Sequence, residues 1–342
     1  MTFLAAVAIM FGAAAALGAL DTGEVTGPSA PGPVTSAPTD ASTVTSATAP
    51  TTTSTTEPVP EPAADVAALA DRTTMTPQAR RIFYAAEPVL VDKAGLGSAC
   101  DLRAEVSVLG CFASGEITVL RVEDPRLDGM METTAAHEML HAVWAQRSAA
   151  ERDELIPLLR TAYDALDDPR VRDKVETYRR DDPDVVDNEL HSILGTEVAD
   201  LPDELGRYYG QWFTDRAAVV ALAASSQATF AAIEDEVDAL DADLAARSAA
   251  IGEAQAALDA RRVELDALDA ELERLRAAGE VAAYNQLVDT YNAGAAAYNA
   301  EADRVRAAID DYNAIVARRN ALVEEWAALR EPIDTSAADP VS

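Results

Sequence analysis

The amino-acid sequence predicts an α+β protein in which a domain with a small sheet precedes a long antiparallel pair of helices. Two stretches, AEVSVL at 104–109 and GEITVLRV at 115–122, have the composition of strands separated by a turn. The segment METTAAHEMLHAVW at 131–144 has the pattern of a buried helix. From Ile233 onward, apolar residues recur in a 4-3 alternation, which is typical of a coiled coil.

The composition indicates that the 342 residues divide into several segments. Hydrophobic residues make up 49% of the chain but aromatic residues only 5%, so much of the apolar content is alanine, which adds little to a core. The net charge is −32, from 27 Lys+Arg against 59 Asp+Glu. Because binding phosphates requires clustered basic side chains, this charge excludes a nucleic-acid-binding surface.

The first 65 residues predict an export or membrane signal followed by a spacer. Phe3 to Leu20 has no charged residue and is long enough to cross most of a bilayer as a helix. We expect residues 1–20 to be a retained anchor, or a cleaved signal that leaves a secreted protein. Residues 21–65 are rich in Thr and Pro and are typical of a disordered stalk. The rest of the chain is therefore expected outside the cytoplasm.

The two cysteines agree with an oxidising compartment. Cys100 and Cys111 flank the first expected strand, and a disulfide between them would staple the strand–turn–strand unit. Two free buried thiols are the alternative.

The chemistry is concentrated in HEMLH at 137–141. On a helix, His137 and His141 project from one face at a spacing that lets both imidazoles reach one metal ion. Glu138 stands beside them, where a carboxylate can accept a proton from a metal-bound water without being a ligand. The motif predicts a site for one Zn²⁺ ion with Glu138 as general base.

A third ligand is expected downstream, in the segment from Asp182 to Phe213. Glu189 opens NELHS within a helical stretch that we expect to end at Gly195. Glu197 and His191 are the alternatives, because both side-chain types bind zinc. His191, Tyr208 and Tyr209 are also candidates to donate a hydrogen bond to a developing oxyanion, with core packing as the simpler role of the tyrosines.

These residues resemble the gluzincin metallopeptidases, which carry HExxH on one helix and a glutamate on a second helix some tens of residues later. The interval from His141 to Glu189 is 48 residues, and Glu-x-x-Ser is similar to the Glu-x-x-small pattern of that group. The resemblance implies a zincin-like domain over 66–225, His137, His141 and Glu189 as zinc ligands, and protein or peptide substrates. It also makes Glu116 to Val122 a candidate edge strand for an extended substrate, with ordinary membership of the sheet as the alternative.

The remaining chain predicts a helical hairpin over 226–332 and a short disordered tail over 333–342. The first seam runs from Ile233 to Leu275, AAGE at 277–280 interrupts it, and Tyr-Asn pairs recur in multiples of seven in the second arm. Such a hairpin can form a dimer or hold a cell-envelope partner. An envelope interaction protein with an inactive zincin domain is therefore the alternative to an extracytoplasmic zinc endopeptidase.

Overall fold

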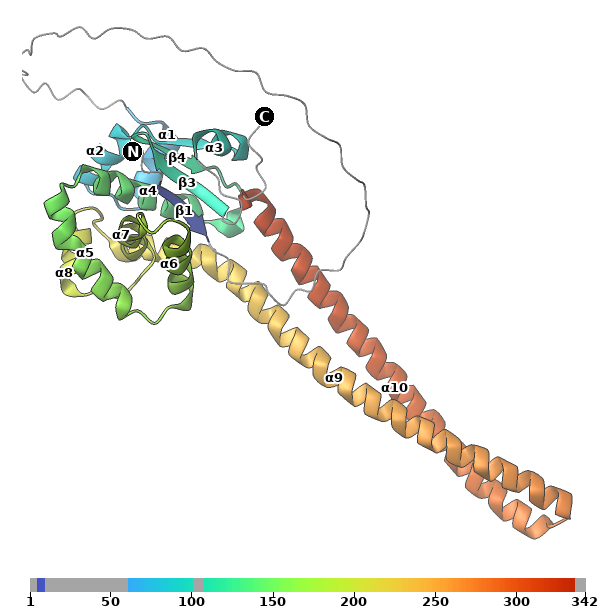
Figure 1. Cartoon of the computed structure of the whole chain (residues 1–342). Helices are drawn as coiled ribbons and strands as arrows, with labels where there is room; N and C mark the ends of the chain where they lie inside the picture. The colour runs from blue at the N-terminus through green and yellow to red at the C-terminus, as the bar shows by residue number, and fades with distance from the viewer. Residues whose placement is uncertain (1–4, 10–60, 101–106, 336–342) are drawn as a thin grey trace, which may run out of the picture.

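The computed structural model describes residues 5–9, 61–100 and 107–335. Its helices and strands form a small mixed sheet, a surrounding set of helices and a long projecting helix pair (Figure 1). In chain order they are β1 (Ala5–Ile9), α1 (Ala64–Arg72), α2 (Pro77–Ala85), β2 (Val89–Val91), α3 (Lys93–Ala99), β3 (Ser107–Ala113), β4 (Glu116–Leu120), a 3₁₀ turn (Pro125–Leu127), α4 (Met130–Gln146), α5 (Ala149–Asp164), α6 (Pro169–Asp181), α7 (Val186–Thr196), α8 (Asp203–Tyr209), α9 (Arg216–Ala278), α10 (Val281–Arg330) and a second 3₁₀ turn (Glu331–Ile333). The predicted α+β class is confirmed at this coarse level.

The sheet has the strand order β1-β3-β4-β2. β3 and β4 are antiparallel and meet at Ser114 and Gly115, which both have positive φ. β2 pairs parallel with β4, so β4 has a neighbour on each side. The expectation that Glu116 to Val122 forms an edge strand is therefore wrong. The alternation of this segment is weak, and a strand buried on both faces and both edges produces the same pattern.

The Cys100–Cys111 disulfide is present, with a Cα–Cα distance of 5.9 Å. Cys111 lies inside β3, and Cys100 directly follows α3. The bridge therefore joins a helix to a strand, and not the strand–turn–strand unit that we expected. Asp92 caps α3 by accepting a hydrogen bond from the Gly95 backbone N–H at 2.8 Å, and this local signal had not been recognised in the sequence. Residues 101–106, which include part of the expected first strand, lie outside the described residues.

The N-terminal segment differs from the predicted membrane helix where the structure describes it. Ala5–Ile9 is a β-strand that pairs antiparallel with β3. The open edge of β3 offers unpaired N–H and C=O groups, and an apolar segment of the same chain can satisfy them. The rest of residues 1–20, most of the expected stalk over 21–65 and the end of the expected tail over 333–342 lie outside the described residues.

Two hydrophobic cores hold the domain together. The larger core surrounds α4 and includes α1, α2, α5, α6 and α7. The second core lies between α3, the disulfide, β3 and the base of the helix pair, and contains Phe230, Leu322 and Leu329 from α9 and α10. The expected boundary between residues 225 and 226 falls inside α9, because its first turns pack into the domain through Val219 and Ala223.

The long helices α9 and α10 form the predicted antiparallel pair and project from the domain (Figure 1). The turn is at Gly279, which adopts a left-handed conformation as the C-cap of α9. The four heptad tyrosines, at positions 284, 291, 298 and 312, are half-buried. Among the described residues, α9 is the one helix long and apolar enough to cross a membrane. A third of its most apolar stretch is buried inside the protein.

Candidate metal centre

Helix α4 carries the HExxH residues through the centre of the larger core. It packs against the sheet on one side and against α7 on the other. His137 and His141 are 1% exposed and Glu138 is completely buried. The small and apolar residues around them, such as Ala136, allow the helix to be enclosed on several faces. The small and apolar neighbours of HEMLH therefore allow the motif to be buried in the core.

Helix α7 approaches α4 closely and brings Glu189 to the histidines. A Cβ atom on Gly195 would lie 2.5 Å from the Leu140 Cδ1 atom and 2.7 Å from the Tyr209 Cε1 atom. A larger residue at this position would push the two helices apart. Gly195 lies within α7, which ends at Thr196, so its role is close packing and not the helix end that we expected.

The structure brings His137, His141 and Glu189 together as a group that could hold a metal ion. The His137 Nε2 atom is 3.4 Å from Glu189 Oε2, and the His141 Nε2 atom is 3.5 Å from Glu189 Oε1. Ligands about 2.0–2.1 Å from a tetrahedral zinc ion lie about 3.3–3.4 Å from one another. The observed separations match this geometry.

The hydrogen-bonding capacity of the polar atoms in this group would be better satisfied by a metal ion than by contacts among the three side chains. Five atoms have no hydrogen-bond partner among the described residues: His137 Nδ1, His137 Nε2, His141 Nε2, Glu189 Oε1 and Glu189 Oε2. Leaving buried polar atoms unpaired costs about 1–3 kcal/mol each. A cation bound to two imidazole nitrogens and the carboxylate would satisfy most of them.

The ionisation of the group also favours a metal. Burial lowers the pKa of His137 well below its usual range and lowers that of His141 to about 4, so both rings are neutral at physiological pH. Neutral imidazole is the form that binds metals. Burial raises the pKa of Glu189 well above its usual range, although the nearby Tyr178 hydroxyl and Lys174 ammonium oppose this shift. A bound cation would remove the penalty for ionising Glu189.

Ser192 orients one of the histidine rings. Its Oγ atom lies 3.2 Å from His141 Nδ1, and both groups are completely enclosed. This contact leaves His141 Nε2 directed at Glu189. Hydrogen bonds of this kind commonly fix the ring orientation of metal-binding histidines.

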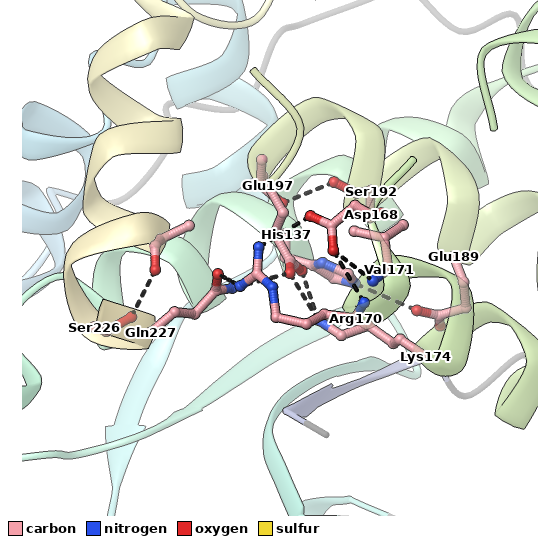
Figure 2. A network of polar contacts seen from close by, with 12 residues as sticks. His137, Asp168, Arg170, Val171, Lys174, Glu189, Ser192, Glu197, Ser226 and Gln227 are labelled. Atoms are coloured by element: carbon pink, nitrogen blue, oxygen red, sulfur yellow. Dashed lines mark hydrogen bonds and ion pairs between the residues drawn. The ribbon is translucent and has the colours of Figure 1, made fainter. Parts of the chain in front are cut away.

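The two alternative ligands lie elsewhere. Glu197 forms a buried ion pair with Lys174, whose Nζ atom is 2.8 Å from both carboxylate oxygens. Figure 2 shows this pair beside His137 and Glu189, with Gln227 of α9 bonded to Glu197 at 3.4 Å. Glu197 therefore links α6, α7 and the base of the helix pair.

His191 also has other partners. Its Nε2 atom lies 2.7 Å from the Tyr208 hydroxyl, and its ring packs against Trp144 at a centroid distance of 5.2 Å. His191 follows Glu189 by two positions on α7, which directs the two side chains to different faces of the helix. Neither Glu197 nor His191 belongs to the metal-binding group among the described residues.

The two tyrosine candidates are in the same aromatic cluster as His191. Tyr209 is completely buried, and its hydroxyl donates to the His191 carbonyl at 2.7 Å, which is a packing role. The Arg147 guanidinium lies 5.4 Å from the Tyr208 ring centroid. An oxyanion role for His191, Tyr208 or Tyr209 stays a prediction.

Sequence reasoning missed two α6 residues near the group, Lys174 and Tyr178. The chain has only two lysines, Lys93 and Lys174. This rarity was the one feature of the sequence that could have directed attention to Lys174. Tyr178 gave no signal, because its position relative to Glu189 depends on how α6 packs against α7.

Comparison with known proteins found no match: no protein family, no curated protein and no solved structure is similar to this chain. Its function is therefore inferred from the residues and their geometry.

Proposed function

We propose that this chain is a zinc-dependent endopeptidase with a zincin-like domain that acts outside the cytoplasm. The observation that carries the proposal is the buried group of His137, His141 and Glu189 with Glu138 beside it. Three protein ligands leave one position of a tetrahedral ion open, which is typical of catalytic zinc sites and not of structural ones. The disulfide and the apolar N-terminal sequence support an extracytoplasmic location.

Each residue of the group would have a separate role in peptide hydrolysis. Zinc, when bound, lowers the pKa of a coordinated water and polarises a substrate carbonyl. His137, His141 and Glu189 would hold the ion, and Ser192 would keep the His141 ring in place. Glu138 would accept the proton of the attacking water and pass it to the leaving amine.

The position of the sheet is consistent with this proposal. A Cβ atom on Gly110 would lie 2.6 Å from Thr134 Cγ2 and 3.4 Å from Glu138 Cγ, so β3 crosses α4 directly at the general base. An extended peptide that took the place of β1 beside β3 would therefore pass close to Glu138.

The test is to compare wild type with Glu138→Gln in residues 61–342, a span that contains both cores. We expect one zinc ion per chain in both proteins, and hydrolysis of casein or a peptide library about 10²–10⁴-fold slower in the variant. Glu132→Gln is the matched control, because Glu132 lies on the same helix but pairs with Arg72. A wild type that binds no zinc, or equal hydrolysis by wild type and Glu138→Gln, would refute the proposal.

The helix pair supports a second candidate, a protein that holds an envelope partner or a second copy through residues 226–332. Val263 and Val281 are 65% and 68% exposed, and both lie toward the far end of the pair. Val263→Glu with Val281→Glu should abolish dimerisation or partner retention and leave zinc content unchanged. Unchanged association in that variant would exclude these residues as the docking point.

A further inference from the structure

We propose that helix α6 is a lid over the metal centre, and that a peptide reaches the centre when α6 lifts away from α7. The inference rests on the proposed endopeptidase function and adds the step that admits the substrate. Four features of the structure carry it: the closure of the metal-binding group, the place of α6 beside that group, the limited hold on α6, and the ion pair that joins α6 to the end of α7.

The metal-binding group is closed to solvent. His137, His141 and Glu189 are each 1% exposed, and Glu138 is completely buried. Hydrolysis requires the carbonyl group of a peptide to reach the metal ion and the carboxylate of the general base. Some part of the protein must therefore move before a substrate can bind.

Helix α6 lies beside this group. Its Lys174 side chain runs past His137 and Glu189 to Glu197 (Figure 2). Burial raises the pKa of Glu189, and the Tyr178 hydroxyl and the Lys174 ammonium lie near enough to oppose this shift. Lys174 and Tyr178 are four positions apart, so they lie on the same face of α6. That face is therefore turned toward the metal-binding group.

The two helices that carry the ligands cannot leave without disrupting the group. α4 supplies both histidines and is in close contact with β3, where a Cβ atom on Gly110 would lie 2.6 Å from Thr134 Cγ2. α7 supplies Glu189 and is held close to α4 at Gly195. α6 supplies no member of the metal-binding group found among the described residues. It can therefore move while the three ligands stay in place.

The hold on α6 is limited. The helix packs chiefly against α7, and three of its 13 residues are buried: Val171, Lys174 and Val175. A cavity of about 320 Å³ lies between its C-terminal end, α5 and α7. Beside this cavity the contact with α5 is polar, because the Tyr163 hydroxyl donates to Glu176 Oε1 at 3.5 Å. Lifting α6 therefore exposes little apolar surface beyond the two valines.

A buried ion pair acts as the latch of the lid. The Lys174 Nζ atom lies 2.8 Å from both carboxylate oxygens of Glu197, and the two side chains are 8% and 7% exposed. In the closed position their attraction offsets the lost hydration, and in the open position water hydrates both charges. Residues 165–168 and 182–185 connect α6 to α5 and α7 and belong to no helix. The helix can therefore lift as a unit on these two connections.

The experiment measures how often α6 lifts in the full-length, zinc-loaded chain. The chain has two lysines, Lys174 on the inner face of α6 and Lys93, whose side chain is 33% exposed. An acetylating reagent modifies a lysine when its amine is accessible. Mass spectrometry of Lys174 therefore reports opening of the lid, and Lys93 is the internal reference. Zinc transfer to EDTA and peptide hydrolysis are measured on the same samples.

Two variants with the same chemical change separate motion of the lid from a general loss of stability. Val171→Ala with Val175→Ala weakens the hold on α6. Val66→Ala with Val219→Ala is the control, because these valines are buried to a similar degree in the same core but lie on α1 and α9. We expect the α6 variant to acetylate Lys174 and to transfer zinc to EDTA at least about tenfold faster than the control. The reference lysine should react equally in both.

Wild type supplies a second measurement that does not depend on the folding of a variant. Its Lys174 should become reactive at urea concentrations well below those that unfold the chain. Equal acetylation of Lys174 in the two variants, or a wild-type Lys174 that reacts only as the whole chain unfolds, would overturn the lid. Faster acetylation of Lys174 in a chain that binds no zinc and hydrolyses nothing would support the lid and refute the proposed function.

Discussion

Two helices of this protein use their residues in opposite ways. α4 has 17 residues, of which 13 are buried, and these include two histidines and two glutamates. α9 has 63 residues, of which nine are buried, and all nine are apolar or small. Burying a titratable group lowers stability unless something compensates for it. The contrast teaches that α4 encloses titratable side chains in the core, whereas most of α9 lies outside the core and buries only apolar or small residues.

The largest expected effect comes from the buried ion pair beside the metal-binding group. Lys174→Met leaves the Glu197 carboxylate buried without its cation and should lower the free energy of unfolding by about 3–5 kcal/mol. Arg318→Met breaks the exposed pair between Arg318 and Glu236 in the helix pair and should cost about 0–1 kcal/mol. Urea denaturation of both variants measures the difference. Equal losses of unfolding free energy in the two variants would contradict the expected difference between the buried and the exposed ion pair.

A second effect concerns the pH dependence of the metal-free protein. The pKa of His141 is about 4 in the folded state against an ordinary 6.5, so the unfolded chain binds more protons between these values. Stability should therefore fall as the pH is lowered from about 6.5 to about 4, by up to about 3 kcal/mol from this residue. Denaturation of wild type and His141→Gln at several pH values checks this.

Glu189 should act in the opposite direction in the same experiment. Its raised pKa means that the folded state holds its proton more tightly, so stability falls as the pH rises above about 4.5. Glu189→Gln should remove that loss. A wild-type profile that matches those of both variants would contradict the assigned shifts.

A smaller effect is expected from the hydroxyl that orients His141. Ser192→Ala should weaken zinc binding about 10–100-fold, because the ring loses the contact with its Nδ1 atom. Ser226→Ala removes a buried hydroxyl that donates to the Ala223 carbonyl of its own helix, and should leave zinc affinity unchanged. Competition titration with a chelator gives both affinities. Equal affinities in the two variants would exclude Ser192 as a positioning residue.

The smallest expected effect is the difference in stability between alanine substitutions at two glycines of the helix pair. Gly279 has φ of +73°, and Gly279→Ala should destabilise the pair by about 1–2 kcal/mol. Gly252 lies within α9 with open space around it, and Gly252→Ala should stabilise the helix by about 0.5–1 kcal/mol. Denaturation followed by helical circular dichroism should give opposite signs. The same sign for both would contradict the turn geometry.

The sequence predicted features that depend on spacing along one element. The i, i+4 histidines, the heptad positions and the Gly-containing turn are all set by helix geometry, and the structure has the helices that these patterns require. The disulfide partners were also identified, because the chain has two cysteines.

Features that depend on which elements become neighbours were missed. The residue pattern of Glu116 to Val122 does not indicate that β2 pairs with the second edge of this strand. Gly195 was interpreted as a helix end, but it allows the close contact between α7 and α4. Lys174 reaches Glu197 only because α6 packs against α7. Such contacts depend on long-range packing, which local periodicity does not contain.

The most direct test of the metal centre is the zinc content of two variants with the same chemical change eight positions apart. Glu189→Gln removes the carboxylate that lies 3.4–3.5 Å from the histidine nitrogens, and Glu197→Gln changes the partner of Lys174. After dialysis against a weak chelator, we expect one zinc ion per chain in wild type and in Glu197→Gln, and almost none in Glu189→Gln. Full zinc content in Glu189→Gln with loss in Glu197→Gln would contradict the account.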